Sequence, residues 1–211
     1  MGEIIVTIIG CLLVSNIIFT NFLGMCPFLG ISKNPKNAIG MGCALTFVVA
    51  FSSIICYCIQ RFIFIPLSLA VTKGESAGAF DFLQLVVFIL VIASFVQLVE
   101  FFMKKYMKGL YKALGIYLPL ITTNCVVLFV AQAVAKYGFD AGVVTFDYSF
   151  IEMLVYSVFT ALGFMLVITL FSFIRVRLES TDIPKPFKGN AIALITTALM
   201  VLAFAAFKGL V

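Results

Sequence analysis

Six long apolar runs dominate this sequence of 211 residues. A helix of about 20 apolar residues spans the hydrocarbon core of a bilayer. Helices suit that environment because they pair their backbone hydrogen-bonding groups within the segment itself. The sequence therefore predicts an all-α integral membrane protein with six transmembrane helices. Their approximate ranges are Ile4–Gly24, Ala38–Gln60, Phe82–Phe102, Ala113–Ala135, Phe150–Ile174 and Ala191–Phe207.

The composition agrees with lipid as the surrounding solvent. Hydrophobic residues make up 64% of the chain and charged residues only 11%, whereas about a quarter of a typical soluble domain is charged. The segments between the runs are short, so we expect one membrane domain over residues 1–211 and no separate soluble domain. The net charge of +5 is spread between the runs rather than gathered in one patch, which argues against nucleic acid as a partner.

The first apolar run is expected to stay in the protein as a membrane helix. Glu3 stands near the N-terminus, where a secretory signal would carry basic residues. The run also continues beyond the usual length of the apolar part of a signal peptide. We therefore expect no cleavage after this segment.

The positions of the basic residues predict the orientation of the helices. Ten of the 14 Lys and Arg residues fall after the first, third and fifth runs. Cytoplasmic loops are enriched in Lys and Arg, so six helices leave both termini on the outer side. The glycine-containing loops Thr72–Asp81 and Lys136–Ser149 then also lie outside. The ten residues are Lys33, Lys36, Lys104, Lys105, Lys108, Lys112, Arg175, Arg177, Lys185 and Lys188.

The order of the runs is compatible with a three-plus-three inverted repeat, with halves of about residues 1–103 and 104–211. Inverted repeats commonly place a functional site on helices that are broken near the middle of the membrane. The uncharged run Ile4–Ser32, which opens the first half, and the helix that opens the second half each contain a proline, in Asn21–Pro27 and in Pro119–Cys125. Proline removes a backbone donor and clashes with the preceding turn. We therefore expect helices 1 and 4 to be broken near mid-membrane.

Two of the six cysteines, Cys26 and Cys125, lie in these expected breaks. Freed backbone amides there could hydrogen-bond thiolate or sulfide, as a buried iron–sulfur cluster requires. Two unrelated kinks, or a transport site, remain alternatives. Two thiolates are also fewer than the four that a [2Fe–2S] cluster normally takes, so a second chain would supply the rest. The other four, Cys11, Cys43, Cys56 and Cys58, are interpreted as small apolar side chains.

Other polar and small residues in the runs have simpler interpretations. Glu100 stands four residues before Lys104, a spacing that favours an ion pair on a helix; with Gln97, it could instead be functional. Glu152 suits the start of a helix because the N-terminal dipole attracts a carboxylate. Gly40, Gly42 and Gly163 are expected to allow close packing of helices.

Three segments resemble one family of membrane proteins, and the resemblance runs over essentially the whole chain. The family contains the A subunits of the Rnf complexes, which are ion-pumping ferredoxin:NAD oxidoreductases. It also contains the homologous NqrE subunits of the sodium-pumping NADH:quinone reductases. The Cys-Pro-Phe form of the first segment favours the Rnf branch. The segments are FLGMCPFLG at 22–30, LGIYLPLITTNC at 114–125 and DIPKPFKGNAIALIT at 182–196.

The resemblance implies a shared redox site in a bacterial cell membrane. It implies that a homologous, oppositely oriented E subunit pairs with this chain, and that Cys26 and Cys125 are its two ligands to one [2Fe–2S] cluster. Electron transfer across the membrane would be coupled to Na⁺ or H⁺ transport. The chain would then be a component of an enzyme without catalysis of its own. A component of the quinone reductase and an inverted-repeat secondary transporter are the alternatives.

Overall fold

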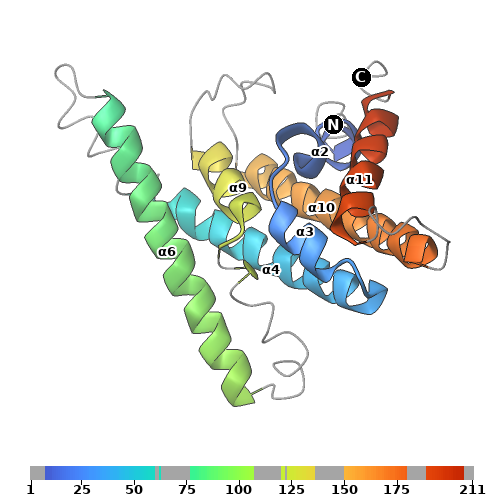
Figure 1. Ribbon diagram of the computed structural model, residues 1–211. Coiled ribbons are helices and arrows are strands. Elements are labelled where there is room, and N and C mark those ends of the chain that lie inside the picture. Colours follow the sequence, from blue (N-terminus) through green and yellow to red (C-terminus); the bar gives the residue numbers. More distant parts are fainter. Residues whose placement is uncertain are drawn as a thin grey trace. The chain divides into compact units, whose positions relative to one another are not determined.

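The computed structural model describes residues 8–59, 62, 77–106, 120–121, 123–135, 150–179 and 189–206. In these residues the regular structure is helical, without strands (Figure 1). This agrees with the all-α prediction. The loop 136–149, residues 72–76 of the other outer loop, Pro119 and Thr122 lie outside the described residues. The elements are η1 (Gly10–Val14, a π-helical turn), α2 (Ile17–Asn21), α3 (Met25–Ile31), α4 (Pro35–Ile59), α6 (Ala77–Tyr106), α9 (Cys125–Ala135), α10 (Phe150–Glu179) and α11 (Asn190–Ala205).

Two of the described helical segments are long and apolar enough to cross a membrane, namely Pro35–Ile59 and Phe150–Leu178. Three shorter apolar helical stretches accompany them, Leu85–Phe101, Cys125–Val134 and Asn190–Ala205. Each of the five coincides with one of the apolar runs predicted from the sequence. The complete topology of six spans and the inverted repeat remain predictions.

The helix boundaries differ from the sequence prediction at two informative places. α4 begins at Pro35, three residues early, because proline is well suited to the first turn of a helix. The carbonyl of Asn34 accepts the amide hydrogens of Asn37 and Ala38, which starts the helix. α10 continues to Glu179, so Arg175 belongs to the helix and not to the loop in which the sequence analysis placed it.

The chain divides into two compact units, residues 1–46 with 158–211 and residues 47–157. Aromatic pairs contribute to the core of the first unit. The rings of Phe28 on α3 and Phe171 on α10 stack with their centroids 4.3 Å apart. Those of Phe19 on α2 and Phe204 on α11 lie 4.7 Å apart. The helical pieces of the N-terminal segment are thus packed against both C-terminal helices.

Two glycines allow close contacts within the first unit, as the sequence predicts. A Cβ atom added to Gly42 on α4 would overlap the side chain of Met165 on α10. One added to Gly163 on α10 would lie 2.8 Å from the carbonyl oxygen of Cys11. Both helices therefore approach their neighbours more closely than any larger residue would allow.

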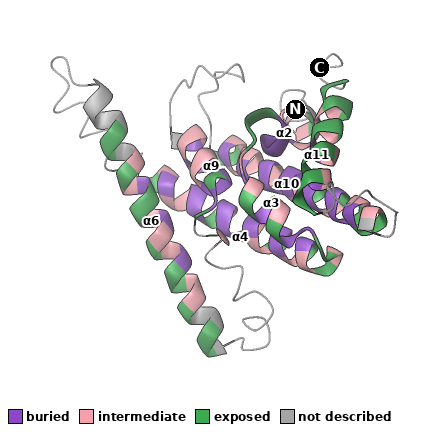
Figure 2. Cartoon of the chain, in the orientation of Figure 1, coloured by how far each residue is buried: buried purple, intermediate pink, exposed green. Residues whose placement is uncertain are grey.

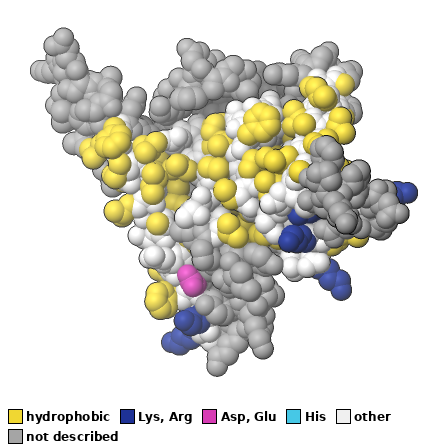
Figure 3. Space-filling model, in the orientation of Figure 1, with side chains coloured by type: hydrophobic (Ala, Val, Ile, Leu, Met, Phe, Trp, Pro, Cys, Tyr) yellow, Lys and Arg dark blue, Asp and Glu magenta, His cyan; other side chains and the backbone are white. Residues whose placement is uncertain are grey.

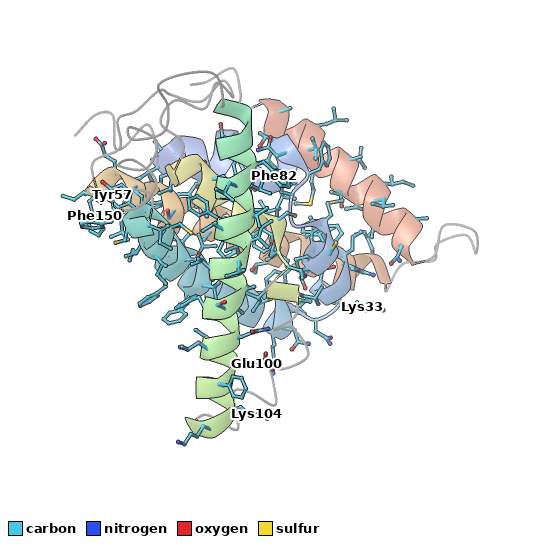
Figure 4. All side chains as sticks on the ribbon, turned by 90° about the vertical axis from the view of Figure 1, so that its left-hand side faces the viewer. Lys33, Tyr57, Phe82, Glu100, Lys104 and Phe150 are labelled. Carbon is cyan, nitrogen blue, oxygen red and sulfur yellow. The ribbon has the colours of Figure 1, made fainter. Side chains whose placement is uncertain are left out.

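The second unit contains α6, α9, the end of α4 and the start of α10. One face of α6 is buried at four-residue intervals, at Phe88, Ile92 and Val96, so the helix packs along a single stripe (Figure 2). The rings of Tyr57 and Phe150 meet edge to face with centroids 5.9 Å apart (Figure 4). This contact joins the end of α4 to the start of α10.

Large apolar side chains are also abundant on the surface of the described helices. On α6, Leu90, Leu98 and Phe101 are all more than 60% exposed. Figure 3 shows hydrophobic side chains over much of the described surface on one face of the molecule. Extended apolar surface of this kind is rare on soluble monomers. It is what a protein embedded in lipid or covered by other membrane subunits presents.

Candidate functional site

The first apolar run is divided into helical pieces around a break between α2 and α3. α2 ends at Phe22, whose φ of 54° lies in the left-handed region, and Gly24 follows with a φ of 79°. Left-handed residues stop a helix because they turn its backbone out of the hydrogen-bonding pattern. Glycine adopts this conformation easily, whereas it is uncommon for a residue such as phenylalanine. The expected break is therefore present and precedes the cysteine.

Cys26 lies in the first turn of α3, directly after this break. Its side chain is exposed and its thiol is free of any disulfide. Pro27 follows within the same turn, where the missing N–H would have had no partner in the helix. The sequence analysis attributed the break to this proline. The structure instead places the left-handed residues Phe22 and Gly24 at the break, and Pro27 within the new helix.

Asn16 fixes the start of the broken segment and was not identified from the sequence. Its Oδ1 accepts the amide hydrogen of Ile18 at 3.2 Å and so caps α2. Its Nδ2 donates to the carbonyl of Gly163 on α10 at 2.9 Å and to that of Leu12 at 3.2 Å. The side chain is buried, as a polar group with its hydrogen-bonding capacity satisfied can be.

Arg175 and Ser172 of α10 hold the other end of α3. The Nη1 atom of Arg175 donates to the carbonyl of Leu29 and to Oγ of Ser32, both at 2.8 Å. The hydroxyl of Ser172 donates to the carbonyl of Ser32 at 2.8 Å. Arg175 is buried, with 5% of its surface exposed. The sequence analysis counted this arginine only as a charge that indicates orientation.

The second cysteine also opens a helix. Cys125 is the first residue of α9, and its side chain is exposed and in no disulfide. Oδ1 of Asn124 accepts the amide hydrogen of Val126 at 3.0 Å, which is the bond that an N-cap residue makes. The Nδ2 atom of Asn124 is buried without a hydrogen-bond partner among the described residues. Asn124 thus caps α9 with the same kind of bond that Asn16 makes to α2, from the amide hydrogen two residues later to Oδ1.

The remaining four cysteines do not share this arrangement. Cys11 and Cys56 are buried, whereas Cys43 and Cys58 are exposed. Sγ of Cys43 lies 4.0 Å from Sδ of Met165, in a packing contact between α4 and α10. Among the described residues, no three His, Cys, Asp or Glu side chains converge on a possible metal position. Cys26 belongs to the first unit and Cys125 to the second.

The polar residues considered in the sequence lie at the ends of their helices. Glu152 is in the first turn of α10, as predicted. Glu100 and Lys104 are one turn apart near the end of α6 (Figure 4). Glu100 is half-buried, whereas Gln97 and Lys104 are exposed. The ion pair between Glu100 and Lys104 remains a prediction.

Comparison with known proteins identifies relatives along the whole chain. A family model described as "Rnf-Nqr subunit, membrane protein" matches residues 4–211. A protein of Serratia proteamaculans, named as the A subunit of an ion-translocating oxidoreductase complex, is 45% identical over 211 residues, covering 100% of this chain and 99% of the relative. A protein of Acetobacterium woodii, named as the A subunit of a Na⁺-translocating ferredoxin:NAD⁺ oxidoreductase complex, is 46% identical over 207 residues, covering 98% and 97%. The chain therefore belongs to the Rnf-Nqr family of membrane-protein subunits.

Proposed function

We propose that this chain is the A subunit of an ion-translocating ferredoxin:NAD⁺ oxidoreductase complex. The observation that carries the proposal is the identity of 43–46% over nearly the full length of relatives named as A subunits of ion-translocating oxidoreductase complexes, one of them a Na⁺-translocating ferredoxin:NAD⁺ oxidoreductase. The chain acts as a membrane component of that complex, with other subunits as its partners. Electron transfer from ferredoxin to NAD⁺ is coupled in this proposal to the transport of Na⁺ or H⁺.

Cys26 and Cys125 are proposed to supply two of the four ligands of a [2Fe–2S] cluster. The donor chemistry fits, because thiolates are the usual ligands of such clusters. Both side chains are exposed and neither is in a disulfide, so each presents its sulfur at a surface that another protein chain can reach. Each is also in the first turn of a helix, where backbone N–H groups have no partner within the helix. When bound, the cluster accepts and releases one electron.

The other two ligands are proposed to come from a homologous subunit of opposite orientation. Four of the described thiols remain besides Cys26 and Cys125. Two of these, Cys11 and Cys56, are buried within helices, and Cys43 packs on Met165. A partner with two cysteines of its own would complete the set of four. In this arrangement the chain spans the membrane six times, with helices 1 and 4 broken near its middle and both termini outside.

The residues around Cys26 set its position and surroundings. The break at Phe22–Gly24 starts a new helix at Met25, and Asn16 anchors the preceding piece to α10. The apolar core formed by residues such as Ile17, Ile18 and Phe28 is buried and keeps water away from this side of the segment. This buried apolar core supports the proposal, because a redox centre shared with another membrane chain needs protection from solvent.

Membrane vesicles that contain the whole complex provide the test. With Cys26→Ser or Cys125→Ser, we expect reduction of NAD⁺ by reduced ferredoxin to fall at least 100-fold, on the order of the loss when a required group is removed. Cys43→Ser, which changes another exposed thiol, is the matched control and should retain the activity. Full activity in both of the first two variants would contradict the proposal.

The same vesicles distinguish the transported ion. If Na⁺ is transported, the vesicles should accumulate Na⁺ during the reaction, and a sodium ionophore should abolish this accumulation whereas a protonophore should not. If H⁺ is transported, the vesicles should become acidic instead, and the protonophore should abolish the acidification. A reaction in tight vesicles that causes neither change would show that electron transfer is not coupled to ion transport.

A further inference from the structure

We infer that Arg175 is a positioning residue for Cys26, which it serves through the short helix α3. This inference rests on the proposed role of Cys26 as a cluster ligand. Arg175 is on α10 and donates to the carbonyl of Leu29 and the hydroxyl of Ser32 at the end of α3, while Cys26 is in the first turn of the same helix. The arginine therefore acts on the cysteine through the intervening helix.

The contacts at this end of α3 form one continuous anchor on α10. Phe171 stacks on Phe28, Ser172 bonds the carbonyl of Ser32, and Arg175 bonds Leu29 and Ser32. The last carbonyls of a helix have no partner within it, and a cation there is favoured by the helix dipole. Bonds from a charged donor are also stronger than those between neutral groups. A buried arginine thus supplies what the end of this helix requires.

α3 depends on this anchor because it has little stability of its own. It contains seven residues, far fewer than the roughly 12–15 that an isolated helix needs in water. At its start, the left-handed residues Phe22 and Gly24 interrupt the hydrogen bonding that would continue from α2. Cys26 and Ser32 are separated by about 9 Å along the helix axis, at 1.5 Å per residue. A change in the tilt of α3 at Ser32 therefore moves the sulfur of Cys26.

The charge of Arg175 adds an electrostatic effect to the structural one. Thiolate-bound iron–sulfur clusters are anionic, and their reduction potential depends on nearby charge and burial. A buried positive charge stabilises the reduced form, which carries one more electron. At a separation of about 10 Å in an apolar region, such a charge is poorly screened. Removal of the arginine charge should therefore lower the potential, which loss of packing alone would not predict.

Redox titration of the purified complex, followed by EPR spectroscopy, tests this inference. In Arg175→Gln we expect the midpoint potential of the [2Fe–2S] signal to shift downward and its g values to change. In Arg175→Lys, which keeps the charge but has a different donor geometry, we expect changed g values with a potential closer to that of the wild type. Arg177→Gln changes an exposed arginine of the same helix and should match the wild type in both.

Each outcome bears on the inference. Wild-type potential and g values in Arg175→Gln would overturn it. If Arg175→Gln assembles no cluster, Arg175→Lys takes its place, and a spectrum of Arg175→Lys identical to that of the wild type would overturn it. If the EPR signal survives in the Cys26→Ser complex, the proposed ligand is refuted, and this inference with it. A signal that Cys26→Ser abolishes but Arg175→Gln leaves unchanged would refute the inference alone.

Discussion

The buried side chain of Asn16 makes three hydrogen bonds. It caps α2 through its oxygen, and its nitrogen joins that helix to Gly163 on α10 and to Leu12 in the preceding turn. Because the same amide serves both helices, it fixes where the broken segment begins and how that segment sits on α10. An apolar residue of similar size could do neither.

Substitution of Asn16 should therefore reveal both parts of its role. In Asn16→Ala we expect the free energy of unfolding to fall by about 1–3 kcal/mol, since the cap and a buried hydrogen bond are both lost. Asn16→Asp keeps the oxygen that caps α2 but lacks the donor to Gly163. Thermal unfolding of the purified complex should rank the wild type above both variants. Equal melting temperatures for all three would contradict this assignment.

Single residues also show which parts of the site the sequence can reveal. Cys26 and Cys125 could be singled out because each lies in a short segment that contains a proline, which is a local signal. Asn16 and Arg175 gave no such signal, since their partners are 147 and 146 residues away in the chain. A long-range hydrogen bond depends on the packing of two helices, and neither local spacing nor composition encodes it.

At the scale of the helices, the first apolar run is the most informative element. Its proline predicts a break, and the break is present, but Pro27 lies in the first turn of α3. The left-handed conformations of Phe22 and Gly24 end the preceding helix instead. Phenylalanine rarely adopts that conformation, so no propensity would have identified it. The helix ends could be predicted only within a few residues. Arg175 was expected just after the fifth run, and it lies within α10.

Gly42 and Gly163 set the distances between neighbouring helices. In Gly42→Ala the new methyl group would overlap the side chain of Met165, and in Gly163→Ala it would lie 2.8 Å from the carbonyl of Cys11 and 3.0 Å from Nδ2 of Asn16. Such overpacking typically costs about 1–3 kcal/mol. We expect both variants to melt at a lower temperature than the wild-type complex. Gly10→Ala is the control because no atom lies within 4 Å of its added Cβ, and a decrease of the same size there would contradict the argument.

At the scale of the whole molecule, the apolar composition and the run lengths predicted a helical membrane protein, and the described helices and the family agree. These properties can be predicted from the sequence because the bilayer requires every spanning segment to satisfy its backbone hydrogen bonds internally. The complete redox site is different, since its proposed ligands come from more than one chain. Its geometry depends on assembly, which one sequence does not determine.

The most direct test of the central claim is EPR spectroscopy of the purified, reduced complex, together with measurements of iron and acid-labile sulfide. We predict a [2Fe–2S] signal that disappears in Cys26→Ser and in Cys125→Ser, with the loss of about two iron atoms per complex. The signal should persist in Cys43→Ser, whose thiol is also exposed. An unchanged signal and iron content in both Cys26→Ser and Cys125→Ser would contradict the account.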